Sequence, residues 1–171
     1  MTASGAPMAF LSLGPTYLNV VKGLNITYAT FVTSLFMVFG VLGTITGGVI
    51  SDKIHSRKLV YTIGLGLSMI CYPLLPYLTG LLIPFIVMVW GFIFNLAPPA
   101  IFAVPSDLLG PELAGVGLGI VNAIIGLSIG YPPLMWGITL KALGSWELGL
   151  DMFLVLSVIG VIIGWLPKGV K

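Results

Sequence analysis

The stretch GVISDKIHSRK, residues 48–58, carries the densest charge in the sequence and lies between two long apolar runs. The run before it extends from Tyr28 to Ser51, and the run after it extends from Leu59 to Tyr77. A helix needs about 20 mainly apolar residues to cross roughly 30 Å of hydrocarbon, so each run is long enough to span a bilayer. We therefore interpret the charged stretch as a short loop between two antiparallel membrane helices.

Charges and turn residues divide the rest of the chain into four further apolar segments. The first segment contains Pro7 and Pro15, and no Lys or Arg precedes Lys22. This disfavours a cleaved signal peptide, because such a peptide starts with positive charge. We predict an all-α membrane protein whose residues 1–171 form a single transmembrane domain of six helices. The expected helices cover about residues 3–21, 28–51, 59–77, 81–104, 113–140 and 148–166.

The composition excludes several classes of protein. Of the 171 residues 58% are hydrophobic and 7% are charged, whereas an ordinary soluble domain has roughly 25% charged residues. A net charge of +2 is too small and too spread to neutralise a nucleic-acid backbone. One cysteine, one histidine and no charged residue in the middle of a span leave no disulfide, metal site or catalytic constellation to assemble. We expect no metal, no cofactor, no nucleic-acid partner and no enzymatic activity.

The distribution of Lys and Arg predicts the orientation, because cytoplasmic loops retain these residues. With six spans, the opposite side carries only Lys22 and Lys141. The side that holds both termini carries Lys53, Arg57, Lys58, Lys168 and Lys171. We therefore expect a multi-pass protein of the cell membrane with both termini in the cytoplasm.

Small residues four positions apart predict close helix contacts, because helices in lipid associate through close backbone approach. Such pairs occur at Gly43 and Gly47 and, in the fifth expected span, at Gly126 and Gly130. In that span the glycines are followed by Pro132 and Pro133, which remove backbone donors and predict a kink. Ordinary packing of a glycine-rich bundle would also account for any single pair.

Polar side chains at membrane depth are the candidates for a solute site. Unpaired amides are costly in hydrocarbon, so each needs either a hydrogen bond to a neighbouring helix or a place on a polar cavity. Both interpretations stay open from the sequence. The candidate cavity-lining residues are Asn19, Asn95, Asn122 and Tyr131.

The charged loop resembles the signature that the major facilitator superfamily carries between its second and third helices. That signature has Gly, three residues, Asp, a basic residue, any residue, Gly, any residue and two basic residues. His55 stands in the place of the second Gly. The resemblance implies that the charges act as a conformational latch that holds one access state, whereas the charges alone would also fit a plain orienting loop. The matching residues are Gly48, Asp52, Lys53, Arg57 and Lys58.

Other segments are similar to the second six-helix half of the same family. They are residues 14–18, the stretch from Pro111 to Gly119, and residues 130–133. The resemblance implies a fold of two inverted three-helix repeats and a solute held between two such halves. It predicts half of a secondary transporter in the lipid bilayer, moving a small polar or anionic solute by alternating access. A second six-helix half, from the same or a different chain, is then the expected partner. The alternative is a non-transporting accessory protein or a truncated relic of a transporter gene.

Overall fold

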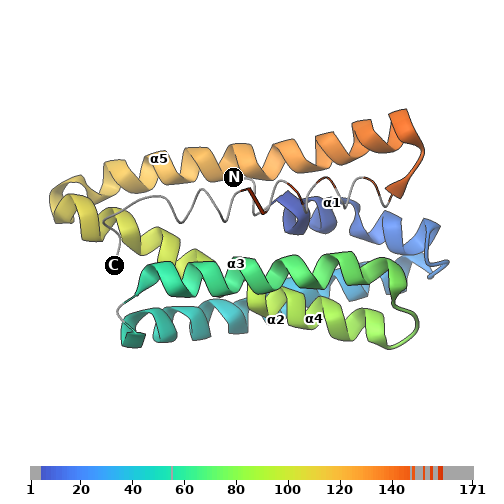
Figure 1. The fold of residues 1–171 in the computed structure, drawn as a ribbon, viewed down its shortest axis with the longest axis horizontal. Coiled ribbons are helices and arrows are strands. Elements are labelled where there is room, and N and C mark those ends of the chain that lie inside the picture. Colours follow the sequence, from blue (N-terminus) through green and yellow to red (C-terminus); the bar gives the residue numbers. More distant parts are fainter. Residues whose placement is uncertain are drawn as a thin grey trace.

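The computed structural model describes residues 5–54 and 56–146 and, beyond them, Leu148, Met152, Val155, Val158 and Ile159. Over this part of the chain the fold consists of helices and short connections, with α5 along one side and α2, α3 and α4 packed on the other (Figure 1). The elements are α1 (Gly5–Val20), α2 (Ile26–Ile54), α3 (Arg57–Leu74), the 3-10 turn η2 (Leu75–Tyr77), α4 (Leu82–Phe94) and α5 (Ala97–Leu143).

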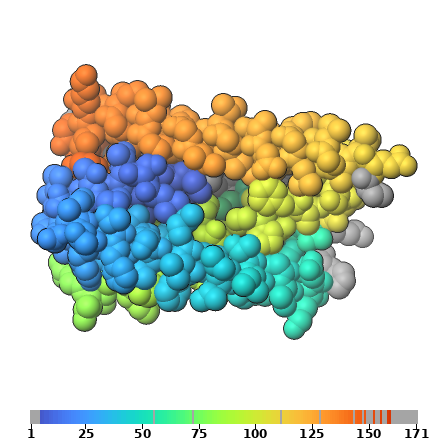
Figure 2. Space-filling model, turned by 180° about the vertical axis from the view of Figure 1, so that it is seen from behind, coloured from blue at the N-terminus to red at the C-terminus, as the bar shows by residue number. Residues whose placement is uncertain are grey.

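Among the described residues, four helical stretches are long and apolar enough to cross a membrane. Large apolar side chains are exposed along them, as expected of surfaces that face lipid. Figure 2 shows α5 along one edge of the molecule and α2 along the other, with α1 between them. The all-α membrane architecture predicted from composition is thus confirmed. The four stretches are Ile26–Ile54, Arg57–Tyr77, Leu82–Gly110 and Glu112–Ala142.

The expected fourth helix, residues 81–104, is interrupted in the structure. α4 ends at Phe94, the chain turns at Asn95 and Leu96, and α5 begins at Ala97. Pro98 and Pro99 follow directly, and because proline has no N–H they cannot bond to carbonyls of the preceding turn. The helix therefore restarts at this point.

α5 contains both the end of the expected fourth helix and the whole fifth one. Its two stretches meet at Gly110, whose φ of 73° and ψ of 173° are not helical. Only glycine adopts this conformation without strain, because it lacks a Cβ. The predicted connection over residues 105–112 is thus reduced to a turn at one residue. The sixth expected helix, residues 148–166, lies mostly outside the described part of the chain.

The core contains an aromatic cluster that joins α1, α2 and α4. Phe10, Phe36, Trp90 and Phe94 are buried, and the ring centroids of Trp90 lie 5.0 Å from Phe10 and 5.3 Å from Phe36. Tilted and edge-on ring pairs at this distance contribute about 0.5–1.5 kcal/mol each beyond the area that they bury. The cluster fixes the depth at which α1 sits against α2 and α4.

Lys22 ties together two connections at the end of the bundle opposite the charged loop. Its ammonium donates to the carbonyl oxygens of Pro76 and Leu78, the latter at 2.9 Å. These carbonyl groups lie at the end of the α3–η2 segment, where no following turn of helix supplies N–H groups to bond them. Lys22 therefore stabilises the junction between the α1–α2 loop and the α3–α4 connection.

Glycines allow α2 and α4 to approach at backbone distance. A Cβ added to Gly43 or Gly47 would collide with the carbonyl group of Phe92 or Leu96, and one on Gly91 with that of Phe36. Close helix packing at Gly43 and Gly47, which the sequence pattern predicted, is confirmed. Membrane helices gain their association energy from such contact.

Replacing Gly91 by Val should destabilise the fold, because the new side chain must push α2 away from α4. We expect a loss of about 1–3 kcal/mol, measured as thermal unfolding of the purified protein in detergent. Gly66→Val is the matched control, since nothing lies within 4 Å of a Cβ at that position. Equal losses in the two variants would contradict the backbone contact.

Candidate functional site

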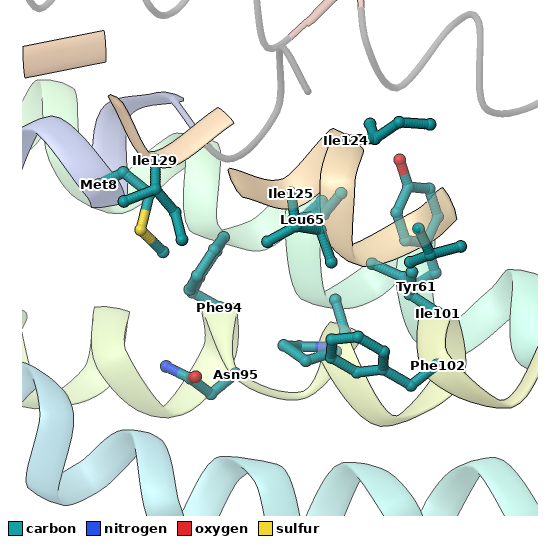
Figure 3. A pocket seen from close by; sticks show the side chains of 13 residues that line it. Met8, Tyr61, Leu65, Phe94, Asn95, Ile101, Phe102, Ile124, Ile125 and Ile129 are labelled. Carbon is teal, nitrogen blue, oxygen red and sulfur yellow. The ribbon is translucent and has the colours of Figure 1, made fainter. Parts of the chain in front are cut away.

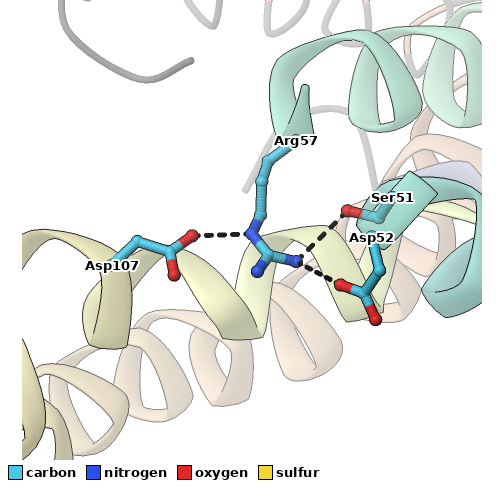
Figure 4. Close-up of polar contacts among 4 residues, drawn as sticks. All are labelled: Ser51, Asp52, Arg57 and Asp107. Carbon is cyan, nitrogen blue, oxygen red and sulfur yellow. Dashed lines mark hydrogen bonds and ion pairs between the residues drawn. The ribbon is translucent and has the colours of Figure 1, made fainter. Parts of the chain in front are cut away.

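An arginine between two carboxylates forms the main charged site. Arg57 Nε donates to Asp107 Oδ2 at 2.6 Å, while Arg57 Nη1 donates to Asp52 Oδ1 at 3.3 Å and to Ser51 Oγ at 3.2 Å. Figure 4 shows the guanidinium reaching from α3 into the space between Asp107 and the pair Ser51 and Asp52. The planar fork of arginine suits this geometry, because its nitrogens can serve two acceptors at fixed angles.

Local chain geometry explains how these groups meet. α2 ends at Ile54 and α3 begins at Arg57, so a very short loop folds Arg57 back onto the last turn of α2. Asp107 is distant in sequence and arrives through the first stretch of α5, which ends three residues later at Gly110. The bridge from Arg57 to Asp107 therefore ties α3 to α5, whereas the bridge to Asp52 ties α3 to α2.

The two ion pairs differ in strength. The side chain of Arg57 is 24% exposed, that of Asp107 is 52% exposed and that of Asp52 is 74% exposed. Water screens the more exposed carboxylate more strongly, and exposed pairs contribute only about 0–1 kcal/mol. The shorter and less exposed pair, Arg57 with Asp107, is the stronger one. Arg57, Asp52 and Asp107 together carry a net charge of −1, and the flanking Lys53 and Lys58 bring the local sum to +1.

The structure brings part of the predicted latch together. Asp52 and Arg57 are in contact, and Gly48 faces Pro99 at ordinary van der Waals distance, 3.9 Å from a Cβ added to the glycine. Lys53 lies in the last turn of α2, and Lys58 is the second residue of α3. The contacts of His55 lie outside the described residues.

Asp107 is the site residue that the sequence motif does not contain. The available signal was topological, because counting spans places Asp107 on the same side of the membrane as the charged loop. Counting spans alone gives no reason to pair Asp107 with Arg57. Pairing requires the helical register of α5, which depends on where α5 restarts after Asn95.

The four candidate cavity residues do not converge on one place. Asn19 is exposed at the end of α1 and donates to the Leu24 carbonyl at 2.7 Å. Asn95 donates to the Gly91 carbonyl at 2.8 Å, and its amide lies against Gly40 of α2. The other two, Asn122 and Tyr131, are exposed on α5.

Gly126 and Gly130 face open space in the described structure, where no atom lies within 4 Å of an added Cβ. The packing partner predicted for them is not among the described residues. At Pro132 and Pro133 the backbone of α5 keeps helical dihedral angles, and the break in this helix is at Gly110. The proline kink stays a prediction.

A cavity of about 370 Å³ lies between α3 and the two stretches of α5. Its walls are almost wholly apolar, and the polar groups among its lining residues are the Tyr61 hydroxyl and the Asn95 amide (Figure 3). The size falls at the lower end of the range of about 300–1,000 Å³ that is typical of small-molecule pockets. Its lining residues are Met8, Tyr61, Leu65, Phe94, Asn95, Ala97, Pro98, Ile101, Phe102, Val121, Ile124, Ile125 and Ile129.

Comparisons with known proteins agree with the sequence motif. A family model of the Major Facilitator Superfamily matches residues 1–133. The chain is 26% identical over 141 residues to a probable sulfoacetate transporter, SauU, of Cupriavidus necator, covering 77% of this chain and 33% of the relative. It is 29% identical over 126 residues to monocarboxylate transporter 12-B of Danio rerio, covering 71% of this chain and 26% of the relative.

The chain thus spans about a third and a quarter, respectively, of the lengths of these two curated relatives. No solved structure matches the chain.

A double-mutant cycle should rank the two ion pairs. We expect Arg57→Gln and Asp107→Asn to show a coupling energy of about 1 kcal/mol in thermal unfolding, because this pair is short and partly shielded. The cycle of Arg57→Gln with Asp52→Asn should give a smaller value. Lys141→Gln, at an exposed position outside the cluster, controls for the loss of a surface charge, and a larger coupling for Asp52 would contradict the ranking.

Proposed function

Since the chain belongs to the Major Facilitator Superfamily, a family of membrane transporters rather than enzymes, we propose that it is one half of a secondary transporter for small organic anions. The observation that carries the proposal is the Arg57 cluster, in which charges of the family signature on α2 and α3 meet Asp107 of α5. Transport would proceed by alternating access, with this half rocking against a partner half around the solute.

Six helices in two inverted repeats of three complete the proposed domain of residues 1–171. The sixth helix would cover residues 148–166 and start at the end of α5. Trp146 supports this start, because its ring packs 5.9 Å from Tyr17 and 5.7 Å from Trp136 between ring centroids. Trp136 Nε1 also donates to the Trp146 carbonyl at 3.3 Å, which fixes the chain where the next helix would leave.

The glycine face of α5, formed by Gly115, Gly119, Gly126 and Gly130, would receive the partner half. These residues lie on one side of the helix at 3.6 residues per turn, and no described atom lies within 4 Å of a Cβ added to any of them. Small residues with open space before them suit close docking of another helix. Asn122 shares this face and is the candidate for contact with solute between the halves, whereas Asn19, Asn95 and Tyr131 stay predictions from the sequence.

The substrate class follows from the relatives and the charge pattern. The names of both relatives specify small organic anions, sulfoacetate and monocarboxylates. The sequence places no cation in the middle of a span, and the described polar groups at depth are amides and hydroxyls. A positive charge that neutralises the anion would therefore come from the partner half, while this half supplies hydrogen bonds and shape.

In this mechanism Gly48, Asp52, Lys53, Arg57 and Lys58 form the latch on the cytoplasmic side of the cell membrane, with both termini on that side. Asp107 extends the latch to α5, so breaking the cluster would free α5 relative to α2 and α3. A bend at Pro132 and Pro133 would let the far end of α5 move with the partner.

The mass of the detergent-purified complex is the first test of the partner half. Light scattering with native mass spectrometry should give about twice the 18.1 kDa of this chain, or a co-purifying six-span protein. A stable lone monomer would contradict the two-half mechanism and support the accessory or relic alternative.

Neutralising Asp52 should damage transport while leaving membrane insertion intact, because the latch loses one of its two anions. We expect Asp52→Asn to lower uptake of labelled sulfoacetate or short monocarboxylates into proteoliposomes by about two- to fivefold, a change of less than about 1 kcal/mol in the barrier, as an exposed ion pair allows. Asp52→Glu, which keeps the charge, should retain most of the uptake. Unchanged uptake in Asp52→Asn would contradict the latch role of this cluster. Uptake of a neutral sugar instead of the acids would contradict the proposed substrate class.

A further inference from the structure

Among the described residues that line the apolar cavity beside α3, one side chain has a polar group without a hydrogen bond. The Asn95 amide donates to the Gly91 carbonyl of its own helix, so it is already engaged. The Tyr61 hydroxyl lines the cavity and makes no hydrogen bond within the described structure. A ligand atom that accepts the hydrogen of this partly buried hydroxyl would add a hydrogen bond where no described residue offers one.

Polarity falls along one face of α3 from the charged end inward. Arg57, Tyr61 and Leu65 are four residues apart, so they lie on one face with steps of about 6 Å at 1.5 Å per residue. A cation comes first, then a phenol, then an aliphatic wall. The same order occurs in a membrane amphiphile, which has a charged head, a polar linkage and a hydrocarbon tail.

The cavity is separate from the face proposed for the partner half. On α5 it is lined by Val121, Ile124, Ile125 and Ile129, whose mean direction lies about 135° around the helix from that of the glycine face at 3.6 residues per turn. A ligand here would lie within this half, between α3 and α5, and not on the solute path between halves. Binding of a ligand in this cavity therefore does not depend on the proposed transport activity.

We propose that this cavity binds one acyl chain of a membrane phospholipid, whose ester carbonyl accepts a hydrogen bond from Tyr61. A cavity of about 370 Å³ with almost wholly apolar walls is large enough for part of a single acyl chain. The nearby guanidinium of Arg57 already serves two carboxylates. A neutral ester is therefore a better match than the carboxylate of a free fatty acid.

The bound chain would fill the space between the two helices that the Arg57–Asp107 bridge joins. Tyr61 follows Arg57 by one turn of α3, and Phe102 precedes Asp107 on α5, so the lipid would lie directly beneath the bridge. Filling this space adds van der Waals contact to both helices at the point where the ion pair holds them.

Photolabelling tests the proposal. The full-length protein, with any partner that co-purifies, is placed in phosphatidylcholine vesicles that contain phosphatidylcholine with a diazirine on one acyl chain, and labelled peptides are mapped by mass spectrometry. We expect label on residues 61–65 and 121–129. Leu65→Trp, which fills the cavity, should reduce this label at least about fivefold, and Tyr61→Phe by about three- to tenfold, the factor expected for one hydrogen bond.

Two matched variants control for general effects. Leu67→Trp adds the same bulk to an exposed position of α3, and Tyr28→Phe removes the same hydroxyl from an exposed position of α2. Neither should change the label in the cavity. Thermal unfolding of each variant shows whether a loss of label reflects a loss of fold.

Three outcomes would overturn the proposal. The first is equal labelling in Leu65→Trp and Leu67→Trp, and the second is labelling by diazirine palmitic acid with none by the phospholipid. The third uses a photoreactive amino acid at Ile125. Crosslinks from that position to residues 147–166, with no lipid label, would mean that this chain's own segment occupies the cavity.

Discussion

The backbone contact between α2 and α4 is the constraint on which the rest of the structure depends. Gly43, Gly47 and Gly91 remove the side chains that would hold these helices apart, so the carbonyl groups of one helix lie against the other. This register places Asn95 beside Gly40, where α4 ends and the chain restarts as α5. The restart sets the direction and rotation of the next fourteen residues, and hence the position of the Asp107 carboxylate against Arg57.

The sequence predicted the membrane helices well because a bilayer fixes their length and polarity. The spans that contain Tyr28 to Ser51 and Leu59 to Tyr77 agree with α2 and α3 within a few residues. The sequence did not predict the break after Phe94 or the one-residue turn at Gly110. The break follows from prolines, which have no backbone N–H, and the turn follows from the non-helical dihedral angles of one glycine. Hydropathy does not record either cause, and apolar residues continue across the break.

The candidate site was predictable only where its residues are close in sequence. Asp52 and Arg57 could be paired from one motif, because a short loop keeps their helices together. Asp107 and the cavity required contacts between distant segments, which depend on helix rotation. The four polar candidates were chosen by their depth in the membrane alone, and depth does not predict in which direction a side chain points from its helix. Asn95 therefore bonds to its own helix, while Tyr61, which depth alone did not single out, presents its hydroxyl to the cavity.

The turn at Gly110 has a consequence for how the protein is made. The stretches Leu82–Gly110 and Glu112–Ala142 are joined with almost no hydrophilic connection between them. Asp107, three residues before the turn, lies on the proposed cytoplasmic side, so the turn faces the ribosome. The second stretch is therefore synthesised directly after the first, with almost no chain between them that could stay outside the bilayer.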